Sequence, residues 1–243
     1  MNTKKIIHKQ LSIITDNFGK LAPNAKILDL GCGNGDIVQS YRELGYECYG
    51  CDLKFKEGNN VETLKKHSWI RLVDPTDYSL PFESNFFDVV LTNQVMEHVK
   101  DYESTLKEMS RVMKKGAIGL HIFPSRYRLI EPHVMVPMGT IIQNRQWLNL
   151  WALLGVKNHN QLNMRKKDIA NYNFNYLYEN TNYLNRSQIK HYFSLFFETV
   201  LFSESFYLKT SRRGKFLWHL SKYIPLIPYL YSELRMRVIV SKK

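Results

Sequence analysis

The sequence predicts an α/β fold built on a doubly wound, mostly parallel sheet. Between Lys26 and Phe123, short apolar runs typical of buried strands alternate with segments of helical periodicity. The first unit, residues 26–52, contains a strand, a glycine-rich turn, a helix and a second strand. Because ligands of such sheets bind at the carboxyl ends of the strands, a functional site is expected at that edge.

The first unit carries glycines and an acid at positions that suit a ligand. Ile27, Leu28 and Leu30 predict a buried strand, and residues 31–35 then read Gly-Cys-Gly-Asn-Gly. Glycines let the backbone approach a ligand where a Cβ atom would collide. The second strand ends in Asp52, where an acid is placed to accept hydrogen bonds from the two hydroxyls of a ribose.

The acids around this loop favour a cationic ligand over a pyrophosphate. Asp29 precedes the loop and Asp36 follows it, and the GxGxG spacing differs from the GxGxxG of dinucleotide binders. The stretch closely resembles the first two motifs of class I S-adenosylmethionine (SAM) methyltransferases, in which the loop passes under the methionine part of SAM and the strand-end acid holds the ribose. This resemblance implies a Rossmann-like, seven-stranded sheet whose last strand is antiparallel. It implies cofactor contacts from Asp29, Gly31, Cys32, Gly33, Asn34, Gly35, Asp52 and Leu53.

Residues 80–99 read LPFESNFFDVVLTNQVMEHV. They resemble the middle motifs of the large methyltransferase group that includes enzymes of the ubiquinone pathway. The resemblance implies that Asp77, or alternatively Asp74, binds the adenine amino group and that the backbone at Tyr78 meets the edge of the adenine ring. Asn93 and Gln94 would then lie beside the sulfonium.

Glu97 and His98 raise the question of a metal site. Some quinone O-methyltransferases of this group use a Glu-x-x-Glu-His metal site, but here the first position is Gln94. A neutral amide is a poor replacement for an anionic ligand of a hard divalent cation. We therefore expect no metal, and we expect Glu97 and His98 to cap or orient the loop after the fourth strand, with His98 also facing the substrate.

The remaining elements follow from apolar periodicity and turn residues. Helices are expected at residues 4–19, 101–115 and 187–197, the second of them with Lys114 and Lys115 in its last turn and Gly116 after it. Strands are expected at residues 69–73, 86–91, 117–123, 198–206 and 236–240.

The chain divides into a SAM-binding part and two insertions. Residues 1–125 and 186–243 are expected to form the SAM-binding domain, and residues 126–185 an inserted helical substrate cap. Residues 207–234 form a basic and apolar insertion between the last two strands, in which Pro225 and Pro228 prevent one long helix. This insertion is expected to pack on the cap, on a membrane surface or on a partner.

The apolar runs and the cysteine count bear on where in the cell the protein is expected. No apolar run reaches the roughly 20 residues that span a bilayer, and residues 1–20 lack the apolar region of a signal peptide. A cytoplasmic location is expected, with peripheral contact to the inner membrane face through residues 207–231 as an option. Three cysteines cannot build a disulfide framework, and Cys48 and Cys51 should point to opposite faces of the second strand.

The net charge of +12 fits an anionic partner: nucleic acid, an anionic membrane or a phosphorylated substrate. The Glu-Pro-His segment at residues 131–133 weakly resembles methyltransferases encoded with bacterial surface-polysaccharide pathways. The expected function is methyl transfer from SAM to a small anionic acceptor, such as a sugar, a nucleotide-linked sugar, or a phosphate or phosphoramidate group.

Two alternatives stay open. One is an RNA methyltransferase, although residues 92–95 read Thr-Asn-Gln-Val where base-amino methyltransferases usually carry Asn/Asp-Pro-Pro-aromatic, so nucleic acid is not the expected partner. The other is a non-catalytic partner subunit with the same fold.

The candidate base for an accepting hydroxyl is His133, in the segment expected to form the wall of the crevice. Arg126 and Arg128 would grip an anionic acceptor, with Glu131 beside them.

Overall fold

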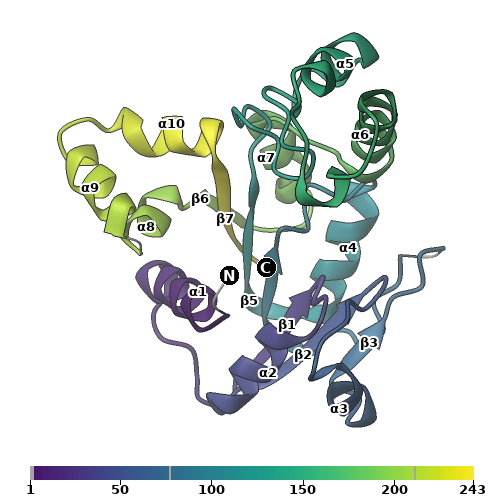
Figure 1. Cartoon of the computed structure of the whole chain (residues 1–243). Helices are drawn as coiled ribbons and strands as arrows, with labels where there is room; N and C mark the ends of the chain where they lie inside the picture. The colour runs from purple at the N-terminus through teal and green to yellow at the C-terminus, as the bar shows by residue number, and fades with distance from the viewer. Residues whose placement is uncertain (1–2, 77, 211) are drawn as a thin grey trace.

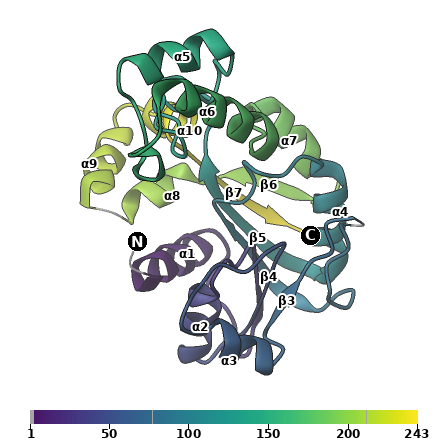
Figure 2. The ribbon, with the colours of Figure 1, turned by 45° about the vertical axis from the view of Figure 1, so that its right-hand side comes forward.

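The structure is a computed structural model that describes residues 3–76, 78–210 and 212–243. It contains one seven-stranded sheet of order β3-β2-β1-β4-β5-β7-β6 (Figures 1 and 2). The strands are β1 (Lys26–Leu30), β2 (Glu47–Asp52), β3 (Ile70–Leu72), β4 (Phe87–Asn93), β5 (Met113–Pro124), β6 (Thr199–Phe202) and β7 (Met236–Lys242). The first five strands pair in parallel, and β7 is antiparallel to both β5 and β6. The predicted fold class is confirmed.

Helices cover both faces of the sheet and create two hydrophobic layers. On one face lie α1 (Thr3–Phe18), α2 (Asp36–Glu43) and α3 (Val61–Lys66); on the other lie α4 (Tyr102–Val112) and α7 (Arg186–Ser194). Cys48 belongs to the first layer and Cys51 to the second, as expected for alternating positions of a strand. Both thiols are buried and unpaired.

Residues 126–185 form a small layer of their own beyond the end of β5 (Figure 1). It contains α5 (Arg145–Leu153), a 3₁₀ turn (His159–Gln161) and α6 (Lys166–Asn180), packed around a cluster that includes Val134, Leu148 and Leu177. Several hydrogen bonds tie it to the loop after β4. Lys100 Nζ donates to the Thr181 carbonyl at 2.8 Å, and Asn182 N donates to the Glu97 carbonyl at 2.7 Å.

Between β6 and β7 the chain forms three short helices that we call the arm, residues 204–234. They are α8 (Glu204–Lys209), α9 (Arg212–Ser221) and α10 (Leu226–Leu234), and Figure 1 shows them extending to the left of the sheet. Pro225 is the N-cap of α10 and Pro228 lies in its first turn, where a missing N–H costs little. Pro225 therefore separates α9 from α10, and the segment forms no single long helix, as the sequence predicts.

The arm is anchored by buried polar groups. Ser232 Oγ donates to Glu204 Oε1 at 2.6 Å, and Arg237 Nη1 donates to Ser232 Oγ at 3.0 Å. Burial raises the pKa of Glu204 above its ordinary value, against the opposing effect of the Ser232 hydrogen bond.

The predicted helix at residues 101–115 is too long. It ends at Val112, and Met113 already pairs with Phe87 as the first residue of β5. The apolar Met113 side chain is fully buried in the sheet layer, which outweighs the helical signal of the two lysines that follow. Lys114 instead pairs with Asp88 at 2.8 Å, and Gly116 adopts φ +78° where the pairing shifts register.

Other boundaries also differ from prediction, most of them by one or two residues. The strand expected at residues 198–206 covers only Thr199–Phe202, because the buried Glu204 starts α8. Strand β4 runs on to Asn93, so this residue ends the strand rather than following it. Helix α7 ends at Ser194, before the expected Phe197, and Asn185 caps its start by accepting from Gln188 N at 2.9 Å.

Candidate functional site

The glycine loop between β1 and α2 takes a path that only glycine follows without strain. Gly31, Gly33 and Gly35 have φ values of +81°, +56° and +76°. A Cβ atom on Gly31 would overlap Val95, and one on Gly35 would overlap Leu64. The loop is thereby packed closely against α3 and against the segment that follows β4.

Asp52 holds this loop from the end of β2. Its Oδ2 atom accepts from Gly33 N at 2.7 Å, and its Oδ1 atom accepts from Lys54 N at 3.3 Å. The same carboxylate lines a cavity, so it is positioned both to shape the loop and to accept hydrogen bonds from a bound hydroxyl.

Asp29 lies behind the loop as a buried acid. It is 2% exposed, and its Oδ2 atom has no hydrogen-bond partner among the described residues. Burial, and to a lesser extent the charge of Asp52, raise the pKa of Asp29 to about 7. A cationic group bound nearby would favour the ionised form, which is the expectation for a sulfonium or ammonium ligand.

A cavity of about 570 Å³, the cofactor cavity, lies at the carboxyl ends of β1, β2 and β4. It is large enough for a nucleoside-sized ligand. Among the residues predicted to contact SAM, its walls include Gly31, Asp52, Leu53, Tyr78 and Gln94. His98 contributes from the predicted substrate set, and Tyr176 and Asn180 contribute from α6.

The other predicted cofactor residues that the structure describes, Asp29, Cys32, Gly33, Asn34, Gly35 and Asn93, do not line this cavity. Cys32 is buried, which raises its thiol pKa far above the ordinary value, and Asn34 Nδ2 donates to Asp36 Oδ2 at 2.9 Å. Asp77 is outside the described residues, so the choice between it and Asp74 stays open. Asp74 is exposed, and hydrogen bonds from the Thr76 side chain and backbone lower its pKa.

Two residues of the site hold unusual backbone conformations. Tyr78 has φ +55° and Gln94 has φ +60°, both in the left-handed region that side chains rarely adopt. Gln94 N donates to the Ile122 carbonyl at 2.8 Å, which ties the turn after β4 to β5. Strain of this kind collects where a functional group must be held in place.

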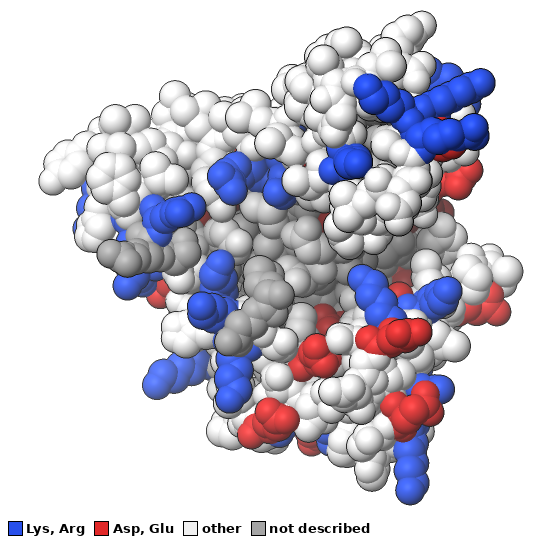
Figure 3. Space-filling model, viewed as in Figure 1, with Lys and Arg blue, Asp and Glu red and all other residues white. Residues whose placement is uncertain are grey.

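A second cavity of about 540 Å³, the cationic cavity, lies on the other side of Gln94. Its floor includes Asn93 and Gln94, and its walls include two tyrosines of the arm, Tyr207 and Tyr231. Four basic residues reach it from three parts of the chain: Lys5 and Lys9 of α1, Arg128 after β5, and Arg235 before β7. Figure 3 shows basic side chains on both sides of a hollow on this face.

These four cations are not neutralised by neighbouring carboxylates. Within the described residues, none of them forms an ion pair. Lys9 Nζ instead lies 4.7 Å from the centre of the Tyr207 ring, and Arg128 Nη1 lies 3.7 Å from Met236 Sδ. The cavity therefore offers positive charge to an anion. Arg126, the other predicted substrate arginine, is engaged elsewhere, since its Nη1 donates to the Tyr183 carbonyl at 2.9 Å.

His133 is held by Glu131 at the base of the cap. Its Nδ1 atom lies 2.7 Å from Glu131 Oε1, which also accepts from Tyr183 Oη at 2.7 Å. Glu131 Oε2 accepts from the backbone N atoms of His133 and Val134. Burial alone would raise the pKa of Glu131, but the hydrogen bonds from His133 and Tyr183 outweigh it and leave the pKa below its ordinary value.

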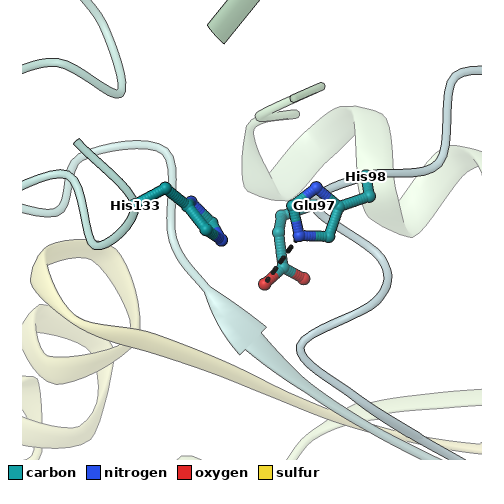
Figure 4. Close-up of side chains that lie close together, drawn as sticks. All are labelled: Glu97, His98 and His133. Atoms are coloured by element: carbon teal, nitrogen blue, oxygen red, sulfur yellow. Dashed lines mark ion pairs between the residues drawn. The ribbon is translucent and has the colours of Figure 1, made fainter. Parts of the chain in front are cut away.

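The free sides of two imidazoles face the carboxylate of Glu97 (Figure 4). The rings of His98 and His133 lie edge to face with centres 4.9 Å apart, and His98 Nε2 lies 3.9 Å from Glu97 Oε1. His98 Nδ1 is 2.6 Å from the Asn180 carbonyl oxygen, which fixes that ring. Ligand atoms of the three side chains all lie within 4.8 Å of one another.

Glu97 is a buried carboxyl without a hydrogen-bond partner for either oxygen among the described residues. Burial raises its pKa to about 7. Burial also lowers the pKa of His98, against the opposing effect of the Asn180 carbonyl. The group can therefore exchange a proton near neutral pH, and its donor atoms are also those that bind a divalent cation. Sequence reasoning missed this grouping because no local spacing brings His133 beside Glu97.

We expect turnover to be unchanged after dialysis against EDTA. Gln94 supplies no anionic ligand, and a cation would have to displace the proton that Glu97 carries over much of the neutral range. The measurement is SAM consumption before and after dialysis, followed by addition of Mg²⁺ or Zn²⁺. Loss of turnover that a divalent cation restores would instead identify Glu97, His98 and His133 as metal ligands.

Known methyltransferases resemble this chain both in sequence, over the part that contains the glycine loop, and in fold. Residues 28–120 match the family model described as a methyltransferase domain. A ubiquinone biosynthesis O-methyltransferase of Pelagibacter ubique is 27% identical over 166 residues, which cover 62% of this chain and 66% of the relative. A demethylmenaquinone methyltransferase of Staphylococcus saprophyticus is 35% identical over 131 residues, covering 48% of this chain and 56% of the relative.

A solved SAM-dependent methyltransferase from Archaeoglobus fulgidus shares the fold, with a TM-score of 0.52 and 16% identity over 98% of this chain and 94% of the other. The first curated relatives are matched over 33% to 66% of their own length. Their shared part contains the glycine loop and the first strands of the sheet. Over residues 28–120 the chain is thus similar to the class I SAM-dependent methyltransferases, and its Rossmann-like fold agrees with that likeness.

Proposed function

We propose that this protein transfers the methyl group of SAM to a small anionic acceptor bound in the cationic cavity. The observation that carries the proposal is the position of Gln94, which lines both the cofactor cavity and the cationic cavity. A donor in one cavity and an acceptor in the other would meet at this residue. Bound SAM supplies an electrophilic methyl group on a sulfonium, and the protein's main task is to align it with a nucleophile.

The residues of the cofactor cavity fit SAM. Asp52 is placed for a ribose, and the buried Asp29 gains a counter-charge from a cationic ligand. In this proposal the amide of Gln94, held in a left-handed turn at φ +60°, would lie beside the methyl group. No residue of the loop offers a cation to a pyrophosphate, which argues against a dinucleotide.

The four unpaired cations favour a phosphorylated or otherwise anionic acceptor over a neutral one. Arginine grips phosphate oxygens through two parallel hydrogen bonds, and Arg128 and Arg235 both line the cavity. A sugar phosphate or nucleotide-linked sugar, as used in surface-polysaccharide synthesis, carries this charge. The names of the relatives support a second candidate, a quinone precursor, which needs less positive charge unless it bears a carboxylate.

His133 lines neither cavity, but its ring centre lies 4.9 Å from that of His98, a wall residue of the cofactor cavity. If the accepting atom is a hydroxyl oxygen that reaches this side of Gln94, we propose that His133 removes its proton. Glu131 fixes the ring through Nδ1, so Nε2 is the atom left to act as the base. The neighbouring Glu97, whose pKa is near 7, then offers a second site for the proton.

Asp52→Ala should weaken SAM binding by about 5- to 150-fold, which corresponds to about 1–3 kcal/mol for unpaired ribose hydroxyls in a formed site. Isothermal titration of the folded variant with SAM measures this. Asp88→Ala is the matched control. Asp88 lies near the amino end of β4, away from the carboxyl ends of the strands where the cofactor cavity lies, and it pairs with Lys114. Equal SAM affinity of both variants would show that Asp52 does not hold the ribose.

The function itself is tested in two steps. Titration of the full chain with SAM comes first, and absence of binding would reject the enzyme in favour of a non-catalytic partner subunit. A SAM-consumption screen then compares nucleotide-linked sugars, phosphorylated metabolites, quinone precursors and bulk RNA. Turnover only with neutral quinone precursors or with RNA would refute the small anionic acceptor while leaving the SAM site intact.

A further inference from the structure

The outer side of the arm exposes large apolar side chains. Phe216 of α9 is 71% exposed, and Tyr223 in the following turn is 85% exposed. Ile224, Leu226 and Leu230 are 47%, 54% and 44% exposed. A soluble surface rarely concentrates this much apolar area within one short segment, and such a patch marks a contact with a partner or a lipid surface.

These side chains are not needed to hold the arm in place. Its inner side is fixed by the buried Leu208 and by the hydrogen-bonded group of Glu204, Ser232 and Arg237. Arg186 adds to this anchor, since its Nη1 donates to Ser232 Oγ at 2.9 Å. Phe216 and Tyr223, the most exposed of the apolar side chains named above, therefore contribute little to this packing.

The arm is uniformly basic. Between Glu204 and Glu233 the sequence contains no acid, while it contains Lys209, Arg212, Arg213, Lys215 and Lys222. Lys209 is paired with Asp16 of α1 at 3.1 Å, but Arg213, Lys215 and Lys222 are exposed, and none of the described carboxylates forms an ion pair with them.

The exposed apolar side chains and the basic charge together indicate which kind of surface the arm would bind. Two copies of the arm facing each other would bring basic surfaces together, which opposes self-association. Apolar and aromatic tips that enter the headgroup region, surrounded by lysine and arginine, are typical of segments that lie on an anionic bilayer. None of the described helices is long and apolar enough to cross a membrane, so the contact would be superficial.

We propose that the outer side of the arm docks on a membrane containing anionic phospholipids. Phe216, Tyr223 and Leu226 would enter the headgroup region, and Lys215 and Lys222 would contact the lipid phosphates. Figures 1 and 3 show the arm projecting from the body of the molecule, where such a contact meets no obstruction from the cap. Because Tyr207 and Tyr231 of the same arm line the cationic cavity, docking would bring that cavity close to the lipid surface.

The test is sedimentation of the full chain with sucrose-loaded vesicles of phosphatidylcholine alone or with about one third phosphatidylglycerol. Binding to the anionic vesicles should be at least about tenfold stronger and should fall as salt is raised. The double variant Phe216→Ser/Tyr223→Ser should lose about tenfold or more in binding. Its matched control is Leu154→Ser/Tyr178→Ser. These two apolar side chains of the cap are 65% and 74% exposed, similar to the 71% and 85% of Phe216 and Tyr223.

The charge is tested separately. Lys215→Gln/Lys222→Gln should weaken binding about tenfold or more, whereas Lys107→Gln/Lys115→Gln removes the same charge from exposed positions outside the arm and should have little effect. The proposal is overturned if neither vesicle binds, if both lipid compositions bind equally, or if arm and control variants bind alike. These outcomes are independent of SAM binding and turnover, so they do not bear on the proposed function.

Discussion

Replacing His133 by alanine should lower turnover by about 10²–10⁴-fold, the usual loss when a general base is removed, while SAM affinity stays the same. The expectation rests on the Glu131–His133 contact of 2.7 Å, which fixes the ring, and on the fact that neither residue lines the cofactor cavity. Turnover with an identified hydroxyl acceptor and titration with SAM are the two measurements.

A structural role for His133 predicts a different outcome, and a second variant separates the two. His133→Asn keeps an amide N–H at the position of Nδ1, where it can donate to Glu131, but provides no base at neutral pH. If His133 only pins the cap, the asparagine variant should recover most of the activity. If it removes the proton, both variants should stay slow although their melting temperatures differ. An acceptor whose oxygen is already ionised would leave both variants active, which would remove His133 from the mechanism.

Gly33→Val should reduce SAM affinity at least about a hundredfold, because the added side chain would lie beside Lys56, a wall residue of the cofactor cavity, and would narrow the space for the cofactor there. The protein itself does not oppose the substitution by contact. The nearest neighbour of a Cβ atom at this position is Lys56 Cδ, at an ordinary 3.5 Å. The φ value of +56° does add strain to any side chain at this position.

The strain has a matched control elsewhere in the chain. Gly45 has φ +88° with nothing within 4 Å of its Cβ position. It lies in the turn between α2 and β2, at the amino-terminal end of the strand, whereas the glycine loop lies at the carboxyl ends. Gly45→Val should lose similar stability in a thermal melt and keep full SAM affinity. If the Gly33 and Gly45 variants bind SAM equally well, the loop is not part of the cofactor site.

Local sequence patterns were sufficient for the first half of the sheet. The strand, loop, helix and strand of residues 26–52 depend on spacings that a single turn imposes, so Gly31 and Asp52 could be placed at one cavity without a structure. Boundaries failed where long-range pairing decided them. Met113 joins β5 because Phe87 pairs with it, and nothing near Met113 in the sequence indicates that partner.

The cationic cavity illustrates the same limit for the site. Arg128 was predicted from its position after the fifth strand, but Lys5, Lys9 and Arg235 come from segments far away in the sequence. Their approach depends on where α1 and the arm pack, which periodicity does not encode. The grouping of Glu97 with His133 has the same origin, since the cap returns to the sheet only through tertiary contacts.

The placement of β7 between β5 and β6 has a kinetic consequence. Lys243, directly after β7, donates from Nζ to the carbonyl of Met113, a residue 130 positions earlier, and the whole strand pairs with β5 over a similar separation. Contacts between residues this distant in sequence form late in folding, because the chain must first lose the entropy of the long loop between them. Until β7 pairs with it, β5 is an edge strand of the sheet: one side is bonded to β4, and the other side carries a row of unpaired backbone N–H and C=O groups. Newly synthesised chains should therefore be most prone to aggregate during this interval, through β5 rather than through the arm or the cap.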